Sequence, residues 1–341
     1  NTATGYRTLK NNTTGLYNTA NGSNSLVANT TGICNSAFGT TSLNANITGN
    51  DNTAIGYSSL KTNTTGSKNV GLGTGTLYFN TTGANNTASG YAALKLNTTG
   101  TDNSAFGMSS LYSNTTGDNN TAIGYNALYD NTIGTKNIAT GNYALSSNTT
   151  GNCNVAYGYY ALSSNTTGSN NTATGYESLK ANTSSYNTAY GYQSLLSNTT
   201  GNSNVANGMF ALKANTTGSN NTANGYQSLF SNTIGNFNTA NGRAALQANI
   251  SANYNTANGY ESLYSNTTGS TNTATGYQSL YSNTTGGYNV ANGSGALYSN
   301  TTGMHNNATG YAALYTNTTG TTNAAYGNHS MRQNTTGNYN N

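Results

Sequence analysis

Residues 52–68 read NTAIGYSSLKTNTTGSK, and closely similar 17-residue units fill the chain. The glycine at the centre of the unit, here called the anchor Gly, recurs every 17 residues from Gly5 to Gly327, with a single 16-residue step between Gly175 and Gly191. The 341 residues therefore hold 20 copies of the unit and no linker. Tandem units of fixed length are typical of repeat proteins, in which each unit packs mainly on its neighbours.

The copies act as an internal alignment that shows which positions tolerate change. Asn always stands four residues before and seven residues after the anchor Gly, Ala stands two before it except at Gly71, and Ser, Ala or Thr stands three after it. Charged residues never occupy these positions, and unpaired charge is costly to bury, so these positions are expected to face inward. The position four after the anchor Gly, the Leu column, is expected to form the structural core ladder: Leu9, Leu26, Leu43, Leu60, Leu77, Leu94, Leu111, Leu128, Leu145, Leu162, Leu179, Leu195, Leu212, Leu229, Leu246, Leu263, Leu280, Leu297, Leu314 and Met331.

The period favours an all-β fold, a parallel β-solenoid (β-roll) with one coil per copy. Seventeen residues are too few for helix-pair repeats, and one Leu per copy cannot build the apolar stripe of a helix. We expect two short strands per coil, around Thr-Ala-x-Gly-Tyr and x-Ser/Ala-Leu-x, with a corner at Asn-Thr-Thr-Gly. At ~4.8 Å per coil, 20 stacked coils would extend on the order of 95 Å. Residues 1–341 are expected to form a single continuous array, a segment of a longer fibre with no separate domains.

The one 16-residue step supports this interpretation. It falls at residues 182–187, where the corner loses a residue while the expected strands keep their spacing. An exposed corner tolerates a deletion, whereas a strand would lose its register.

The restricted positions also suggest that the coil has a partner chain. Adjacent residues of a strand point to opposite faces, yet both the Ser/Ala position and the following Leu are restricted, and so are the Thr/Val and Ala positions before the anchor Gly. Restriction on both faces predicts one face inside the coil and one against another chain. The hypothesis is a homo-oligomer, specifically a homotrimer.

Composition argues against several classes of function. Charged residues make up 5% of the chain, against about 25% in typical domains, and the net charge of +4 is too sparse for a nucleic-acid-binding surface. No stretch approaches the 18 apolar residues of a membrane span, so no membrane insertion is expected. Nucleophilic catalysis needs a base and an orienting acid beside the nucleophile, and no such group recurs. The chain is therefore expected not to be an enzyme and to hold no cofactor, catalytic or metal site.

A few residues need individual interpretation. His305 and His329 lie on neighbouring copies at different positions and are expected to be surface residues. Cys34 and Cys153 share one position seven copies apart, roughly 34 Å, which is beyond disulfide reach, so they are free thiols or crosslinks between chains. The string GLGTG at 71–75 is not a nucleotide fingerprint, because no strand–helix unit surrounds it.

Two recurring residue types have both a structural and a functional interpretation. The Asn seven after the anchor Gly begins an Asn-x-Ser/Thr sequon in 18 of 20 copies, which indicates either an inward Asn ladder, the interpretation we favour, or glycosylation, for example at Asn12, Asn29, Asn63, Asn114, Asn148, Asn266 and Asn317. Tyr often follows the anchor Gly. It either covers a thin core, which we favour, or offers an aromatic surface to carbohydrate or host ligands.

The runs at 52–56 (NTAIG) and 120–124 (NTAIG) resemble the head repeats of trimeric autotransporter adhesins of the Yersinia-adhesin type, which carry a Val-Ala-Ile-Gly core. They are similar also to repeat arrays of bacterial and phage tail-fibre-like proteins. The resemblance implies a left-handed β-roll, a trimer, a cell-surface or virion location, and adhesion. The unit differs from the adhesin repeat, which is nearer 14 residues and carries Val where Thr is common here.

These observations predict a non-enzymatic structural shaft of an extracellular fibre or adhesin, located on a cell surface or virion. The alternative is an ice-binding solenoid with Thr ladders, although the residue before the anchor Gly changes from Thr to Phe, Ile, Tyr and Asn, which breaks any flat Thr face. A disordered Asn/Thr-rich linker is a third interpretation, disfavoured by the strict Leu register. Because no capping unit is visible, end-to-end stacking into filaments is a further expectation.

Overall fold

The computed structural model describes residues 1–341, and each copy of the unit forms one coil of a parallel β-solenoid, as predicted. The chain divides into two compact units, a first unit of Asn1–Asn170 and a second unit of Asn171–Asn341, each of which is described by itself. All elements are strands, and the chain has no helix that could cross a membrane.

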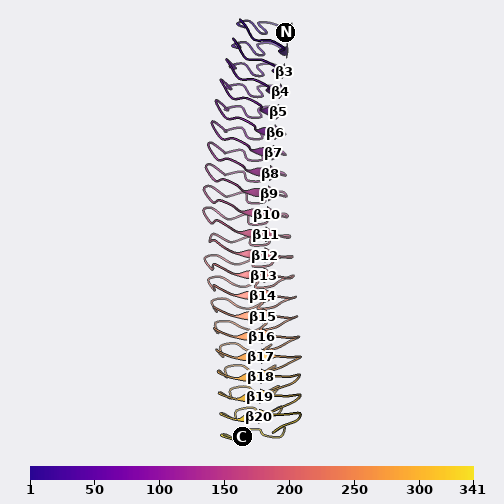
Figure 1. The fold of residues 1–341 in the computed structure, drawn as a ribbon, viewed down its shortest axis with the longest axis vertical. Coiled ribbons are helices and arrows are strands. Elements are labelled where there is room, and N and C mark those ends of the chain that lie inside the picture. The colour runs from indigo at the N-terminus through magenta and orange to yellow at the C-terminus, as the bar shows by residue number, and fades with distance from the viewer. The chain divides into compact units, whose positions relative to one another are not determined.

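Each coil contributes one strand of three residues, and within each unit every strand pairs in parallel with the next strand along the chain (Figure 1). The pairing keeps equivalent residues opposite one another, as in Ala37 opposite Ala54. In the first unit the strands are β1 (Thr2–Thr4), β2 (Thr19–Asn21), β3 (Ser36–Phe38), β4 (Thr53–Ile55), β5 (Val70–Leu72), β6 (Thr87–Ser89), β7 (Ser104–Phe106), β8 (Thr121–Ile123), β9 (Ile138–Thr140) and β10 (Val155–Tyr157). In the second unit they are β11 (Thr172–Thr174), β12 (Thr188–Tyr190), β13 (Val205–Asn207), β14 (Thr222–Asn224), β15 (Thr239–Asn241), β16 (Thr256–Asn258), β17 (Thr273–Thr275), β18 (Val290–Asn292), β19 (Asn307–Thr309) and β20 (Ala324–Tyr326).

The second predicted strand, around Ser/Ala-Leu, is wrong. In each coil this segment is a turn in which the Leu has a positive φ, for example 52° at Leu111 and 51° at Leu94. The left-handed conformation replaces the alternation of a strand, and Ser110 and Leu111 are both completely buried in the same coil. One of the two sequence arguments for a partner chain therefore falls away, because both restricted positions face the interior of one coil.

The anchor Gly turns the chain out of the strand into this segment. Its φ lies between 115° and 144° in the 20 copies, a region that is essentially confined to glycine. Space is limiting as well, since a Cβ on Gly22 would lie 2.7 Å from the carbonyl carbon and oxygen of Gly39 in the next coil. The anchor position therefore admits only glycine for two independent reasons.

The interior of the coil is partly polar, and the two Asn positions supply most of that polarity. The Asn four before the anchor Gly accepts at Oδ1 from the backbone N–H of its counterpart in the next coil, as Asn35 does from Asn52 (3.0 Å). Its Nδ2 donates to the carbonyl of the second Gly of its own coil, which ends the Asn-Thr-Thr-Gly corner, as Asn52 does to Gly66 (2.9 Å). This bond joins residues 14 apart and closes the coil.

The Asn seven after the anchor Gly forms a second ladder. Asn63 donates from Nδ2 to Oδ1 of Asn46 in the preceding coil and to the carbonyl oxygen of Gly66, at 2.8 Å in both cases. The Gly66 carbonyl thus accepts from both Asn positions of its coil. With Leu and Ala, these amides fill an interior that an apolar side chain per coil could not fill alone.

The 16-residue coil of the second unit shows how the corner absorbs a deletion. The carbonyl of Ser184 takes the place of the missing Gly carbonyl and accepts from Nδ2 of both Asn171 and Asn182 at 2.8 Å. β12 stays in register with β13, with Ala189 opposite Ala206. The ladder is preserved because its acceptor is a backbone group that any residue supplies.

Candidate functional surface

Most variable positions of the repeat are exposed or partly exposed, although the position two after the anchor Gly is buried at Ser58, Ala92, Ala244 and Ala312. The outward columns are the candidate functional surface. The Tyr column directly after the anchor Gly is the most aromatic of them. In the second unit Tyr176 stacks on Tyr192 at 5.2 Å between ring centroids, and Tyr260 stacks on Tyr277 at 5.3 Å. The rings remain about two-fifths exposed, with values of 42% at Tyr176 and 43% at Tyr192. Stacked, half-exposed rings both cover the coil and offer a flat aromatic surface.

A second aromatic column lies directly after the Leu column. Tyr264, Tyr281, Tyr298 and Tyr315 stack in succession at 5.1, 5.1 and 5.0 Å with nearly parallel rings. Cations extend these stacks, since the Arg332 guanidinium lies 5.6 Å from the Tyr315 ring centroid. Burial raises the pKa of Tyr281 and Tyr298 above the ordinary tyrosine value.

In the first unit, Lys and Tyr alternate over four successive coils of the same column, at Lys61, Tyr78, Lys95 and Tyr112. Lys61 donates from Nζ to the Tyr78 hydroxyl (2.8 Å), and its Nζ lies 5.0 Å from that ring centroid. Lys95 Nζ lies 5.5 Å from the Tyr112 ring centroid. Cation–π contacts of this kind hold the lysines against the coil and leave a positively charged stripe.

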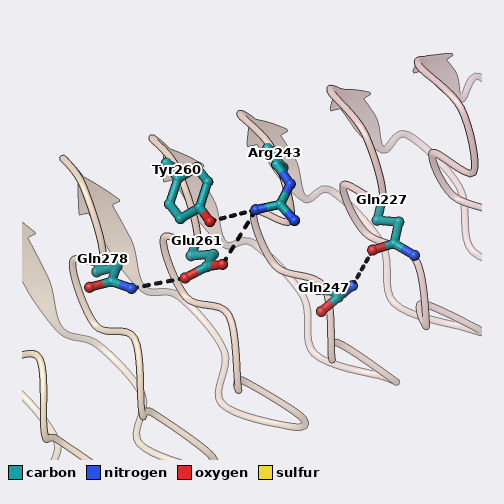
Figure 2. A network of polar contacts seen from close by, with 6 residues as sticks. All are labelled: Gln227, Arg243, Gln247, Tyr260, Glu261 and Gln278. Atoms are coloured by element: carbon teal, nitrogen blue, oxygen red, sulfur yellow. Dashed lines mark hydrogen bonds and ion pairs between the residues drawn. The ribbon is translucent and has the colours of Figure 1, made fainter.

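The second unit has a polar cluster formed by side chains of its outward columns (Figure 2). Arg243 donates from Nη1 to the Tyr260 hydroxyl and lies 3.8 Å from the Glu261 carboxylate, which accepts from Gln278 Nε2 at 2.9 Å. The hydrogen bond with Glu261 raises the pKa of Tyr260. Gln247 Nε2 donates to Gln227 Oε1 at 2.8 Å. All these charges have partners, so the cluster presents no free group for chemistry.

A similar cluster surrounds Glu177 at the start of the second unit. Lys180 donates from Nζ to one carboxylate oxygen at 2.7 Å, and Gln193 donates from Nε2 to the other at 2.8 Å. The hydrogen bond from Lys180 lowers the pKa of Glu177, so the carboxylate stays charged at mildly acidic pH. Because Lys180 is 39% exposed, the ion pair contributes no more than about 1 kcal/mol.

The strand face differs between the two units. In the first unit the residue before the anchor Gly is often large and apolar, and Phe38, Ile55, Leu72, Phe106 and Ile123 are all exposed there. In the second unit this position is Asn in five of ten coils, and Asn224 donates to Asn241, which donates to Asn258, at 2.8 Å in both cases. The first unit therefore carries an exposed apolar strand face, and the second unit a polar one.

The candidate glycosylation residues lie inside the coil. Asn29, Asn63, Asn114, Asn148, Asn266 and Asn317 are completely buried, and Asn12 of the first coil is half-buried. Each donates from Nδ2, the atom that would carry a sugar, to the carbonyl of the second Gly of its coil. A glycan would have to replace this bond and occupy the interior. The ladder interpretation accounts for this geometry, whereas the glycan interpretation does not.

The remaining singled-out residues lie apart from one another. His305 stacks on Tyr288 at 4.9 Å, and His329 meets Tyr311 edge-on at 5.1 Å. Cys34 and Cys153 are exposed free thiols. No group of three or more His, Cys, Asp or Glu side chains could hold a metal ion. The structure thus brings together aromatic and basic side chains of the outward columns, as at Lys61 and Tyr78.

Comparison with known proteins gives no assignment. No protein-family model matches the sequence, and no curated protein matches it.

Proposed function

We propose that the chain is the non-enzymatic shaft of an extracellular fibre or adhesin of a cell surface or virion. The observation that carries this proposal is the separation of interior from surface. The Leu, Ala, Gly and Asn positions repeat one set of hydrogen bonds in nearly every coil, while the outward columns vary freely. Such a design supplies length and a repetitive surface without requiring any particular surface residue.

We also propose that copies of the chain associate through the apolar strand face of the first unit. The exposed Phe38, Ile55 and Leu72 follow one another on β3, β4 and β5, beside a column of Ser36, Thr53 and Val70 that is only partly exposed. Contiguous exposed apolar residues of this kind mark interaction sites. A homotrimer would bury this face on a threefold axis.

Electron microscopy and light scattering test both proposals. The expected results are thin particles of uniform width with a ~4.8 Å axial repeat in diffraction, and a mass of three chains in solution. Globular particles without this repeat would overturn the shaft, and a monodisperse monomer would overturn the trimer. Labelling of intact source cells or virions with an antibody to the protein tests the location, and labelling only after lysis would contradict it.

Ice binding is retained as a second candidate because of the Asn-Thr-Thr-Gly corner. The second Thr of this corner is exposed in consecutive coils at Thr65, Thr82, Thr99 and Thr116. The first Thr is fixed by its hydroxyl, since Thr81 donates from Oγ1 to the carbonyl of Thr98 at 3.0 Å. These columns lie away from the strand residue that varies. A thermal hysteresis measurement distinguishes the candidates, because a fibre shaft is expected to show none.

A further inference from the structure

The GLGTG string at 71–75 belongs to a coil in which the outward columns are interrupted. Here Thr74 stands in the Tyr column and Gly75 stands two after the anchor Gly, a position that carries glycine only here and at Gly295. Tyr57 and Tyr91, in the coils before and after, are each 60% exposed and make no ring–ring contact. In the stacked part of the column, by comparison, the exposed fraction runs from 37% at Tyr260 to 54% at Tyr277.

The gap between these two rings is an open pocket of ≈ 160 Å³. It is lined by Tyr57, Ser58, Thr74, Gly75, Tyr78, Tyr91, Ala92 and Lys95. Adjacent coils place stacked rings about 5 Å apart, so rings two coils apart are separated by roughly 10 Å. For one ligand ring to contact both tyrosine rings, these rings must be about 7–8 Å apart. A small inward tilt of Tyr57 and Tyr91 would bring them to this separation.

The pocket is open because one covering residue points elsewhere. In the other glycine coil, the residue two after the anchor Gly is covered by the residue that follows the Leu of the next coil. Tyr315 covers Gly295 in this way, 3.2 Å from where a Cβ would lie. For Gly75 the corresponding residue is Lys95, whose Nζ lies by the Tyr112 ring, and a Cβ on Gly75 would meet nothing within 4 Å. The two glycine coils thus form a matched pair, one open and one covered.

We propose that this pocket binds one acidic pyranose residue, such as a hexuronate. The C–H faces of the sugar ring would lie between Tyr57 and Tyr91, as apolar faces do on aromatic rings. The carboxylate would pair with Lys95, which lines the pocket and whose Nζ would turn toward the sugar from the Tyr112 ring. A second lysine, Lys61, donates to the hydroxyl of Tyr78, which also lines the pocket. No carboxylate lines the pocket, since Asp51 and Asp102 stand at the corner five before an anchor Gly. The lysines therefore favour an anionic over a neutral sugar.

Calorimetric titration of the full chain with trigalacturonate, and with neutral galactotriose as the comparison, tests the site. We expect one binding site per chain and at least about tenfold tighter binding of trigalacturonate, equivalent to about 1.4 kcal/mol. Thr74→Tyr and Gly75→Gln place residues found elsewhere in the same columns into the gap, and either should abolish binding. Lys95→Gln should remove the preference for the acidic sugar. Ser294→Tyr, the matched change beside the covered Gly295, should leave binding unchanged.

Three outcomes would overturn the proposal: no binding of trigalacturonate at millimolar concentration, equal binding of galactotriose, or undiminished binding by Thr74→Tyr. Circular dichroism of each variant shows whether the coil is intact. The sugar site rests on the proposed adhesin role in one respect, namely that the fibre would encounter the sugar on a target surface. Fibres in micrographs without sugar binding would overturn this site alone, and sugar binding by a globular particle would overturn the shaft alone.

Discussion

The side-chain amide of Asn283 donates from Nδ2 to Oδ1 of Asn266 in the preceding coil, at a distance of 2.8 Å. The same Nδ2 donates to the carbonyl of Gly286 in its own coil at 2.9 Å, and Asn300 repeats both bonds one coil later. All of these amides are completely buried. The ladder therefore links the coils through the interior, where each hydrogen bond is shielded from water and a missing partner is costly.

Replacement of a ladder Asn is expected to destabilise the solenoid far more than replacement of an outward Asn. Asn283→Ala leaves Oδ1 of Asn266 buried without its donor, at an expected cost of about 1–3 kcal/mol. The matched control is Asn292→Ala on the exposed strand face of the same unit, which should change stability by less than about 0.5 kcal/mol. Urea unfolding followed by circular dichroism measures both. Equal losses would mean that the ladder adds no stability.

The Leu column makes an unusual demand on side-chain shape. Leu111 has a φ of 52°, and β-branched residues are strongly disfavoured there. Leu111→Ile should therefore cost at least about 1–2 kcal/mol more than Leu111→Met, although both substitutions keep the apolar volume. Met331 occupies the same column with a φ of 47°, so Met fits the backbone. Thermal melting of the two variants gives the comparison, and an Ile variant as stable as the Met variant would contradict the prediction.

The sequence predicts the period, the coil and the fold class, because 20 copies show which positions accept charge. Its limit is seen at Ser110 and Leu111. The pattern marks both as restricted, but it does not reveal the sign of φ, and so a strand was expected where the chain forms a left-handed turn. The pocket at Gly75 could not be predicted either. It depends on the direction taken by Lys95, which stands 20 residues further along the chain, and no local pattern encodes that direction.

The two glycines of the unit are expected to differ in tolerance. At the anchor Gly107, with a φ of 129°, a Cβ would lie 2.6 Å from the carbonyl oxygen of Gly124, and Gly107→Ala should cost more than about 3 kcal/mol. At Gly100 a Cβ would lie 2.5 Å from Asn97 Oδ1, but without a positive φ.

The chain itself contains a substitution at the second Gly position. The carbonyl of Ala252 accepts from Asn249 at 3.2 Å, and the carbonyl of Gly235 one coil earlier accepts from Asn232 at 3.1 Å, so the Ala keeps the hydrogen bond of the ladder. Gly100→Ala should accordingly cost only about 1–2 kcal/mol. Urea unfolding decides between the two glycines. If Gly107→Ala does not fold, the yield of soluble β-structured protein from both variants still ranks them, and a Gly100→Ala variant that is the less stable would contradict the argument.

Self-association is expected to depend on the strand face of the first unit. Ile55→Asp with Ile123→Asp places two charges on the exposed apolar face and should shift the oligomer to monomer, because burying an unpaired carboxylate costs several kcal/mol. Asn207→Asp with Asn292→Asp adds the same charge at the equivalent position of the second unit and should leave the mass unchanged. Light scattering coupled to size-exclusion chromatography gives the mass of each variant. Dissociation by both pairs would mean that net charge rather than this face governs assembly, and dissociation by neither would place the interface elsewhere.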